Sequence, residues 1–362
     1  MSNLAYRILF TLFCLSMVGC KSSDLETSNL SLKFLSEFIV PDNVLIDGTE
    51  VGGLSGIDFY NNQYYLVCDD SKNPRVYFAT IDITDTVISN ISVDSVLFVK
   101  DSLHFLDLES IRYSSQLNEI ILTSEGHINT KKNPTLFSIN EQGGVVRSFK
   151  IPSAFNAVSH QMPRHNGTLE GLSISYDKSG YWIAMELPLK ADGEEPKFNE
   201  TKSPVRITYI NSTTEAPQKQ FSYFLDPIAK NPKGNFAVNG LTDLIEYKKD
   251  VFIVIERSYS GGYGNQGNTI KIYKVDSKNA SNTLGMSSLK NGKFTAAKKE
   301  LLLNFEDIKN ELINKSIDNI EGITLGPKLS NGNNSLLLVS DNNFNRTEKQ
   351  LNQFILLEIV EN

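Results

Sequence analysis

The sequence predicts an all-β protein folded as a β-propeller of four-stranded blades, and three observations carry this prediction. One short pattern recurs five times along the chain, and each copy is followed by further strand-like runs. Helical periodicity is almost absent. The last copy lacks a fourth strand, whereas the N-terminal part of the chain holds a spare one. In many propellers a strand from one terminus completes the blade formed by the other terminus. This closes the ring and leaves no long sheet edge exposed.

The recurring pattern is Leu or Ile, then two polar or small residues, then Leu or Ile. Its five copies are Leu54-Ser55-Gly56-Ile57, Leu108-Glu109-Ser110-Ile111, Leu169-Glu170-Gly171-Leu172, Leu241-Thr242-Asp243-Leu244 and Ile320-Glu321-Gly322-Ile323. Each copy begins the first strand of a blade. A second run, rich in β-branched and aromatic residues, ends in an acid: 64–69, 119–125, 181–186, 251–256 and 335–341.

The outer strands follow in the same order. Third strands are expected at 75–82, 135–140, 205–211, 269–276 and 354–360, and fourth strands at 93–100, 145–151, 220–225 and 299–305. Residues 32–40 supply the missing fourth strand of the last blade. We therefore count five blades. Six remains an alternative, because 188–203 and 277–293 are long enough to contain further strands. The only helix expected is a short one within 305–314.

The N-terminus indicates export. Arg7 precedes the apolar run 8–18, which is too short to span a bilayer. The run ends in Met17-Val18-Gly19-Cys20, which resembles the bacterial lipoprotein signal although Met17 replaces the more usual Leu. We expect a signal peptide at 1–19, lipidation of Cys20, a linker at 20–31 and the propeller domain at 32–362. The predicted location is the cell envelope, at the outer membrane or surface. A simple cleaved signal and an N-terminal membrane anchor are the alternatives.

Composition narrows the class of partner. The 362 residues are 40% hydrophobic and 21% charged, with a formal net charge of -7. No basic stripe is present, so nucleic acid is excluded as an expected partner. Besides Cys14 and Cys20 the chain has one more cysteine, Cys68, which lies in an apolar run. We interpret Cys68 as a core residue and expect no internal disulfide. We expect a monomer that binds an anionic small molecule or an ester.

The repeat concentrates acids at one face. The start of a blade's first strand and the end of its antiparallel second strand lie at the same end of the channel. First strands place Glu109, Glu170 and Glu321 there, and second strands place Asp69, Glu125, Glu186, Glu256 and Asp341 there. Carboxylates gathered in a concavity repel one another, and Ca²⁺, which takes 6–8 oxygen ligands, would offset this repulsion. Purely structural use of these acids, bonded to backbone N–H groups of neighbouring blades, is the competing interpretation.

Basic side chains are expected at the same face. Arg75, Arg257 and Arg346 follow second strands and would bind the oxygens of an anionic substrate. His165 lies in the loop that leads into Glu170, where it is a candidate general acid for a leaving oxygen, with a plain surface histidine as the alternative.

The quoted repeats, together with Gly53 before the first and Glu256-Arg257-Ser258, resemble the phytase-like family, also described as the esterase-like activity of phytase. The resemblance covers about residues 50–360. It implies a phosphoesterase-type hydrolase with repeated Glu and Asp residues. Thr242 departs from the family pattern, because the other acidic copies have Glu there.

Together these features predict an exported, metal-dependent hydrolase of a phosphoester or related ester. Asp69, Glu125, Glu186, Glu256 and Asp341, with Glu109, Glu170 and Glu321, would hold one or more Ca²⁺ ions, and a spare carboxylate would deprotonate the attacking water. The rival prediction is a non-catalytic surface module that binds a ligand or a protein, since propellers serve many functions.

Overall fold

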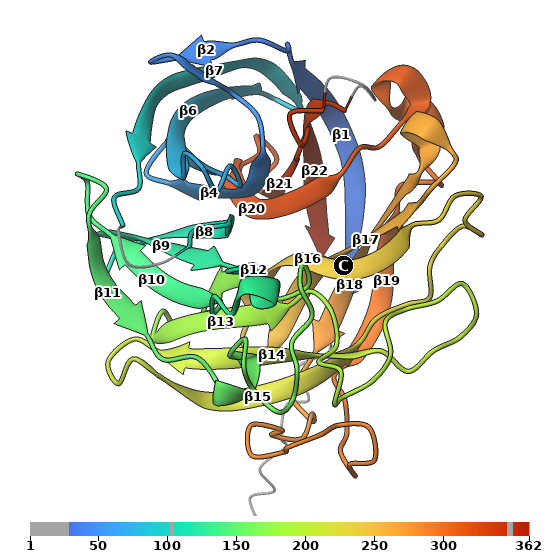
Figure 1. Ribbon diagram of the computed structural model, residues 1–362. Helices are drawn as coiled ribbons and strands as arrows, with labels where there is room; N and C mark the ends of the chain where they lie inside the picture. The colour runs from blue at the N-terminus through green and yellow to red at the C-terminus, as the bar shows by residue number, and fades with distance from the viewer. Residues whose placement is uncertain (1–28, 102–104, 346–349, 362) are drawn as a thin grey trace, which may run out of the picture.

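The computed structural model describes residues 29–101, 105–345 and 350–361. Within them, five four-stranded antiparallel sheets are arranged around a central axis (Figure 1). No helix of this part of the chain is long and apolar enough to cross a membrane. The five-bladed propeller predicted from the repeat is confirmed, and the six-bladed alternative is wrong because 188–203 and 277–297 contain no strand.

The strands agree closely with the predicted runs. Blade A contains β4 (Leu54–Tyr60), β5 (Gln63–Cys68), β6 (Arg75–Thr84) and β7 (Val87–Phe98). Blade B contains β8 (Leu108–Ser114), β9 (Glu119–Ser124), β10 (Thr135–Ile139) and β11 (Val145–Phe149). Blade C contains β12 (Leu169–Ile174), β13 (Gly180–Met185), β14 (Pro204–Asn211) and β15 (Ala216–Phe224). Blade D contains β16 (Ala237–Lys248), β17 (Val251–Ser260), β18 (Asn268–Asp276) and β19 (Lys298–Asn304).

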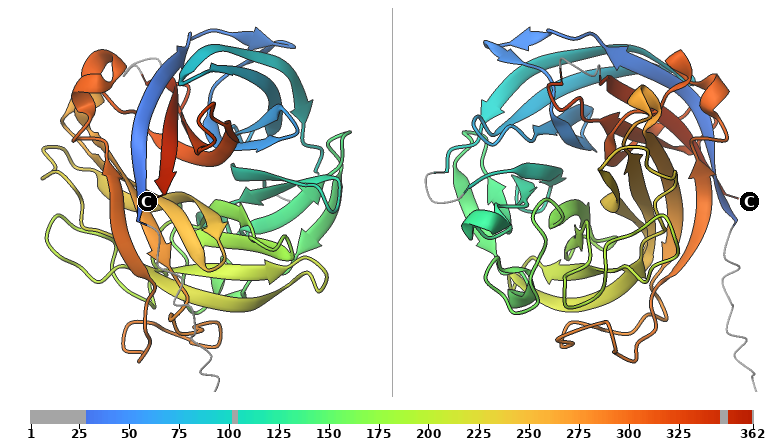
Figure 2. Two further views of the ribbon diagram at one scale, coloured as in Figure 1. Left: turned by 180° about the vertical axis from the view of Figure 1, so that it is seen from behind. Right: turned by 45° about the vertical axis from the view of Figure 1, so that its right-hand side comes forward.

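Blade E is built from both ends of the described chain. It contains β20 (Ile320–Lys328), β21 (Asn334–Ser340), β22 (Asn352–Glu361) and, on its outer edge, β1 (Leu30–Val40). The antiparallel pairing of β1 with β22 runs from Leu30–Glu361 to Val40–Asn352, and both views in Figure 2 show the two strands side by side. This pairing closes the ring, as expected.

The remaining elements are small. A two-stranded ribbon joins β2 (Leu45–Ile46) to β3 (Thr49–Glu50). Five 3₁₀ turns are η1 (Ile128–Thr130), η2 (Ser153–Phe155), η3 (Gly264–Gln266), η4 (Lys309–Glu311) and η5 (Ile313–Lys315). The short helix expected within 305–314 is therefore replaced by 3₁₀ turns. Asn314 and Lys315 have positive φ values of 59° and 50°, which an α-helix does not allow.

Apolar side chains fill the spaces between blades. Trp182 of blade C packs edge-on against Phe252 of blade D, with ring centroids 5.1 Å apart. Cys68 is buried in the layer that joins blades A and E, which confirms its interpretation as a core residue. Each blade buries both faces against its neighbours, so the first strands are held in fixed positions around the axis.

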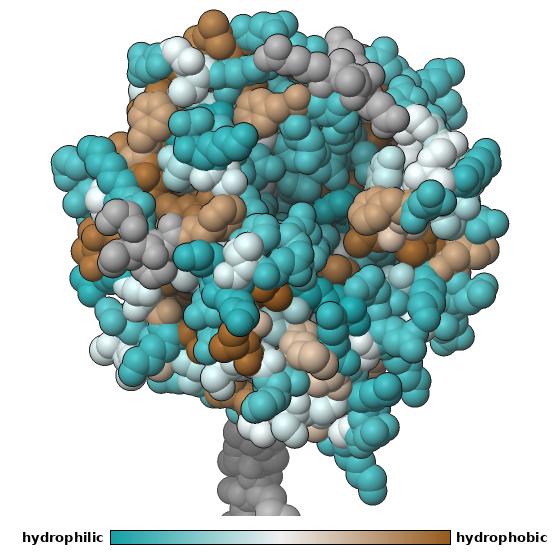
Figure 3. Space-filling model, viewed as in Figure 1, coloured by the Kyte–Doolittle hydropathy of each residue, from teal (hydrophilic) through white to brown (hydrophobic). Residues whose placement is uncertain are grey.

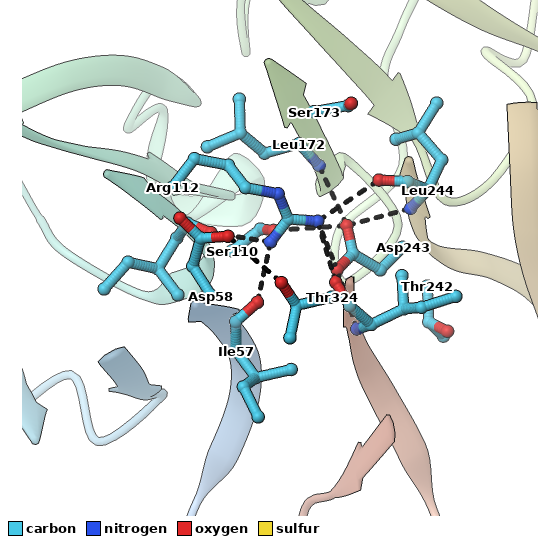
Figure 4. A network of polar contacts seen from close by, with 12 residues as sticks. Ile57, Asp58, Ser110, Arg112, Leu172, Ser173, Thr242, Asp243, Leu244 and Thr324 are labelled. Carbon is cyan, nitrogen blue, oxygen red and sulfur yellow. Dashed lines mark hydrogen bonds and ion pairs between the residues drawn. The ribbon is translucent and has the colours of Figure 1, made fainter. Parts of the chain in front are cut away.

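A buried ion pair between Arg112 and Asp243 joins the blades at the axis (Figure 4). The side chains of Arg112 and Asp243 are 4% and 0% exposed, and their closest N and O atoms are 2.9 Å apart. Arg112 also donates to carbonyl oxygens of blades A, D and E, which belong to Ile57, Leu244 and Ile323. Asp243 accepts hydrogen bonds from the Ser110 hydroxyl and from the backbone N–H groups of Leu172, Leu244 and Ile323. All five blades thus meet at one network.

Candidate metal and substrate site

In the three blades whose first strand carries an acid, a β-bulge directs that acid into the mouth of the channel. In blades C and E the pairing skips one residue, so Glu170 and Glu321 have no partner on the second strand. In blade B the skipped residues are Glu109 and Ser110. Bulges kink a strand and re-aim a side chain, and they are common beside active sites. The same irregularity occurs at Ser55 and Thr242 of blades A and D, where the side chain is uncharged.

The predicted acids converge on one cavity of about 630 Å³. Its walls include seven of the eight predicted carboxylates: Asp69, Glu109, Glu125, Glu170, Glu186, Glu321 and Asp341. Arg257 also lines it, together with Asp318, which the repeat pattern did not mark. Seen from the side of Figure 1, the molecule is hollowed between the blades, and the surfaces around the hollow are mostly hydrophilic (Figure 3).

Blade D differs from the other blades by one position. Leu241 pairs with Glu256, in the way that Leu169 of blade C pairs with Met185. The residue equivalent to the blade C acid Glu186 is therefore Arg257, not Glu256. The prediction that Glu256 lies at the mouth is wrong. Alternation along the strand turns it to the opposite face, where it accepts hydrogen bonds from Asp226 N at 2.9 Å, Asn239 Nδ2 at 2.8 Å, Lys299 Nζ at 2.6 Å and the Tyr223 hydroxyl.

Arg257 brings a cation among the carboxylates. Its Nη2 lies 3.3 Å from Glu186 Oε1 and 3.4 Å from Glu321 Oε1. Its Nε is buried and has no hydrogen-bond partner among the described residues. The guanidinium thus orients two carboxylates, and its Nε–H is left without an acceptor among the described residues.

The carboxylates divide into anchored and free groups. Glu125 accepts hydrogen bonds from Gly167 N at 3.0 Å and Thr168 N at 3.4 Å, across the boundary between blades B and C. Asp341 accepts from Asn343 N at 2.7 Å, and Glu321 from Asn319 Nδ2 at 2.8 Å. These three carboxylates therefore fit, in part, the interpretation that the acids serve the fold by accepting hydrogen bonds.

The carboxylates of Asp69, Glu109 and Glu170 are different, because no hydrogen-bond donor reaches them from the part of the chain that the structure describes. Glu109 and Glu170 are only 8% exposed. Buried charges are normally paired or bound to a metal ion, so Glu109 and Glu170 require a cation or a proton, and the half-buried Asp69 lies beside them in the same cavity.

Three acids of blade B are close enough to share one ion. Carboxylate oxygens of Asp107, Glu109 and Glu125 all lie within 4.8 Å of one another. Asp107 was not predicted, because it immediately precedes the recurring Leu of blade B and the other blades have no acid at that position. An all-oxygen set of this kind fits a hard cation such as Ca²⁺.

Burial raises the pKa values of the whole group, and neighbouring negative charges raise them further. The pKa of Asp69 rises to about 8 through burial and then the charge of Glu321, and that of Glu125 to about 8 through burial and then Glu186. Burial also raises the pKa of Glu186 to about 7, although Arg257 opposes the rise, and that of Asp107 to about 6. The pKa values of Glu109, Glu170 and Asp341 lie well above the ordinary range for the same reasons.

These shifts predict that the metal-free protein is less stable at pH 8 than at pH 5. A raised carboxyl pKa means that the folded state holds more protons than the unfolded state, so stability falls as pH rises from about 4 through the folded-state pKa values near 8. Thermal unfolding in chelator at both pH values would measure the difference. Added Ca²⁺ should raise the midpoint more at pH 8, where more carboxylates are ionised. A metal-free midpoint that rises between pH 5 and pH 8 would contradict this prediction.

Two predicted site residues, the substrate-binding Arg75 and the candidate general acid His165, lie away from the cavity. Arg75 is 2% exposed and is occupied by the Tyr77 hydroxyl at 2.6 Å, Asp70 Oδ2 at 2.9 Å and two carbonyl oxygens. Arg75 joins the β2–β3 ribbon to blade A through the carbonyl oxygen of Glu50. The prediction that Arg75 binds substrate at the cavity is therefore wrong. His165 is not among the residues that line the cavity, and its ring packs against that of His127 at a tilt of 50°, with centroids 4.3 Å apart. Arg346 and Cys20 fall outside the described residues.

Two glycines leave room for the acids. A Cβ on Gly53, whose φ is +61°, would lie 2.2 Å from Asp69 Oδ1. A Cβ on Gly240 would lie 2.4 Å from Glu186 Oε1. A larger residue at either position would force the neighbouring carboxylate to move, and at Gly53 the positive φ disfavours any side chain as well.

Solved structures with a similar arrangement have low sequence identity to this chain. An endo-1,4-β-xylanase from Bacteroides thetaiotaomicron VPI-5482 is 12% identical with a TM-score of 0.47, covering 84% of this chain and 90% of its own. The glutaminyl cyclase of Myxococcus xanthus is 7% identical with a TM-score of 0.41, covering 90% and 97%. A GH43 β-1,3-galactosidase is 10% identical with a TM-score of 0.44, covering 88% and 94%. Likenesses this distant do not indicate what the chain does.

A search of curated proteins finds no significant match. A family model does match, however, over residues 49–344, which is most of the chain. It is the phytase-like model, described as the esterase-like activity of phytase, and it includes all five bulged repeats and every cavity carboxylate named above. The chain therefore belongs to the phytase-like family.

Proposed function

We propose that this protein is a phosphoester hydrolase that depends on a bound divalent cation, with Ca²⁺ as the expected ion. The observation that carries the proposal is a set of carboxylates in one cavity with Arg257 that no hydrogen-bond donor of the described residues reaches, namely the buried Glu109 and Glu170 and the half-buried Asp69. A purely structural ring would have each acid satisfied by backbone donors, as Glu125 is. The family's description as esterase-like supports ester hydrolysis.

Asp107, Glu109 and Glu125 would hold the cation, which would polarise the P–O bonds and neutralise charge on the phosphoryl oxygens. The free Nε–H of Arg257 would donate to a phosphoryl oxygen and fix the ester in the cavity. Glu170, whose raised pKa would be lowered by the nearby cation so that it is ionised, would take a proton from the water that attacks phosphorus, as the water oxygen forms the new P–O bond. Asp69, whose pKa is about 8, would give its proton to the leaving alcohol as the old P–O bond breaks.

The test is a panel of phosphomonoesters and phosphodiesters incubated with the purified protein, in Ca²⁺ and in chelator. We expect release of alcohol or phosphate that requires the ion and falls at least about 100-fold in Glu170→Gln, since positioned general bases contribute about 10²–10⁴-fold. No release from any ester with any divalent cation would refute the proposal. Tight binding of a ligand without turnover would instead support the non-catalytic module.

We also propose that the chain is exported and anchored to the cell envelope through lipid on Cys20. The signal-like sequence 1–19 supports this, and lipidated cysteines carry enough acyl chain for stable anchoring. In cells that process lipoproteins, we expect the protein in the membrane fraction and Cys20→Ala in the soluble or unprocessed fraction. Metabolic labelling with palmitate checks the lipid directly. Equal labelling of both proteins would contradict the proposal.

A further inference from the structure

One side of the cavity is built differently from the others. The first two strands of blade D, β16 and β17, have 12 and 10 residues, whereas those of blades A, B and C have 6 or 7. The second strands of those three blades end immediately before the cavity acid. In blade D pairing continues past Arg257 as far as Ser260, opposite Ala237. The extension adds a wall above the carboxylates, which we call the blade D wall: Phe236, Val238, Arg257, Tyr259 and Asn268.

All five residues of the blade D wall line the cavity. Val238 and Tyr259 are cross-strand partners, and Arg257 lies two residues before Tyr259 on the same face of β17. Phe236 lies two residues before Val238, and its ring centroid is 6.0 Å from that of Tyr259. The wall therefore changes from a cation at the level of the acids to an apolar, aromatic surface further along the hairpin.

Two features of the wall are unexplained by packing within the protein. Phe236 is 63% exposed although it borders a strongly acidic cavity. Asn268, which is 8% exposed and pairs with Tyr259, has a buried Oδ1 without a hydrogen-bond partner among the described residues. An unpaired buried acceptor is costly, and a ligand that donates a hydrogen bond would satisfy it. The apolar side chains of this wall, beside a few polar groups, resemble the lining of sites that bind organic molecules, although the rest of the cavity is acidic.

The charges of the cavity limit the ligand further. Eight carboxyl groups line it, namely Asp69, Glu109, Glu125, Glu170, Glu186, Asp318, Glu321 and Asp341. Among the described lining residues, Arg257 is the one basic side chain that balances these acids. It already forms ion pairs with both Glu186 and Glu321. One or two divalent ions would still leave the lining negative if the acids are ionised. A polyanion would meet net repulsion there, whereas a group with a single negative charge could be held by the ion and Arg257.

From these observations we infer that the substrate is an ester with a single negative charge, such as a phosphodiester, whose apolar or ring-shaped organic group lies on Phe236 and Tyr259 of the blade D wall. The inference rests on the function proposed above, but it makes its own claim about binding. It excludes densely phosphorylated compounds as good ligands. It also assigns specificity to blade D, which has Thr242 at the acidic position of the first strand and Arg257 at that of the second.

The test is calorimetric binding to the Ca²⁺-loaded protein, with turnover followed separately. The probes are bis(p-nitrophenyl) phosphate, dimethyl phosphate and inositol hexakisphosphate, which differ in their rings and charge. Chelation of Ca²⁺ by inositol hexakisphosphate is corrected by a titration without protein. We expect the aromatic diester to bind about 10-fold tighter than dimethyl phosphate, and inositol hexakisphosphate to bind more weakly than the aromatic diester.

Variants distinguish the contribution of the blade D wall to binding from a general effect on the fold. Phe236→Ala should weaken binding of the aromatic diester about 5- to 10-fold and leave dimethyl phosphate unchanged, and Phe236→Tyr should restore it. Phe198→Ala is the matched control, because Phe198 is 47% exposed and does not line the cavity. Equal affinity of Phe236→Ala and the parent, equal or tighter binding of inositol hexakisphosphate, or no binding of the aromatic diester would each overturn the inference. Binding as expected without turnover would support it and refute the proposed hydrolase.

Discussion

The double variant Glu109→Gln/Glu125→Gln should lose Ca²⁺ binding that the parent protein shows in a calorimetric titration. Both side chains belong to the trio with Asp107 whose oxygens lie within 4.8 Å of one another. Each substitution removes a full negative charge and keeps the side-chain volume. We expect at least about a tenfold loss of affinity for each charge removed, which corresponds to about 1.4 kcal/mol, and more for the pair.

Glu256→Gln is the control for this experiment. The sequence pattern placed Glu256 at the end of a second strand, like Glu125. Its carboxylate, however, faces Tyr223, Asn239 and Lys299 instead of the cavity. Its Ca²⁺ affinity should equal that of the parent. Unchanged affinity in Glu109→Gln/Glu125→Gln would place the ion elsewhere, and a loss in Glu256→Gln would show that affinity follows general damage to the fold.

Asp243→Ala should be among the most destabilising substitutions in the chain. It removes one member of a fully buried ion pair and leaves the Arg112 charge without its partner, together with unpaired N–H groups at Leu172 and Ile323. Breaking such a pair costs about 3–5 kcal/mol. Urea denaturation of the parent and the variant would measure the loss in free energy of unfolding.

The same substitution should also weaken Ca²⁺ binding, because the network holds the strands next to the acids. Ser110 follows Glu109 directly, and Leu172 and Ile323 lie two residues after Glu170 and Glu321. Asp192→Ala is the matched control. Asp192 forms an equally buried pair with Arg206, at 2.6 Å, but outside the cavity. It should lose stability and keep its Ca²⁺ affinity. If both variants lose affinity equally, the Arg112–Asp243 network has no special role in positioning the acids.

Local sequence patterns were sufficient to predict where the strands lie. Strands have a two-residue period and β-branched content that can be read from the chain, so the third strand expected at 205–211 and the closing strand expected at 32–40 differ from the observed ones by one or two residues at their starts. The repeat also predicted that the cavity acids share one mouth, because antiparallel pairing alone places the start of one strand beside the end of the next.

The sequence did not determine which way each side chain points. A one-residue difference in register turns a side chain to the other face of a sheet, and this is why Arg257 and not Glu256 enters the cavity. Arg75 follows a second strand as predicted, but ribbon contacts formed only in three dimensions occupy it. Asp107 precedes the repeat and gains its role from Glu109 and Glu125 of its own blade. Asp243 lies inside the repeat, where the other copies have Ser or Gly, and its partners come from distant segments.

The chain by itself therefore determined the four-stranded blades, the closure of the ring and the gathering of carboxylates at one face, since these follow from local periodicity and its repetition, whereas the choice of five blades over six came from the structure. The tertiary structure decided which acids are free, which are anchored and where the one cation lies among the described lining residues. Those properties depend on burial, on bulges and on hydrogen-bond donors from neighbouring blades, and such contacts between distant segments leave no local pattern in the sequence.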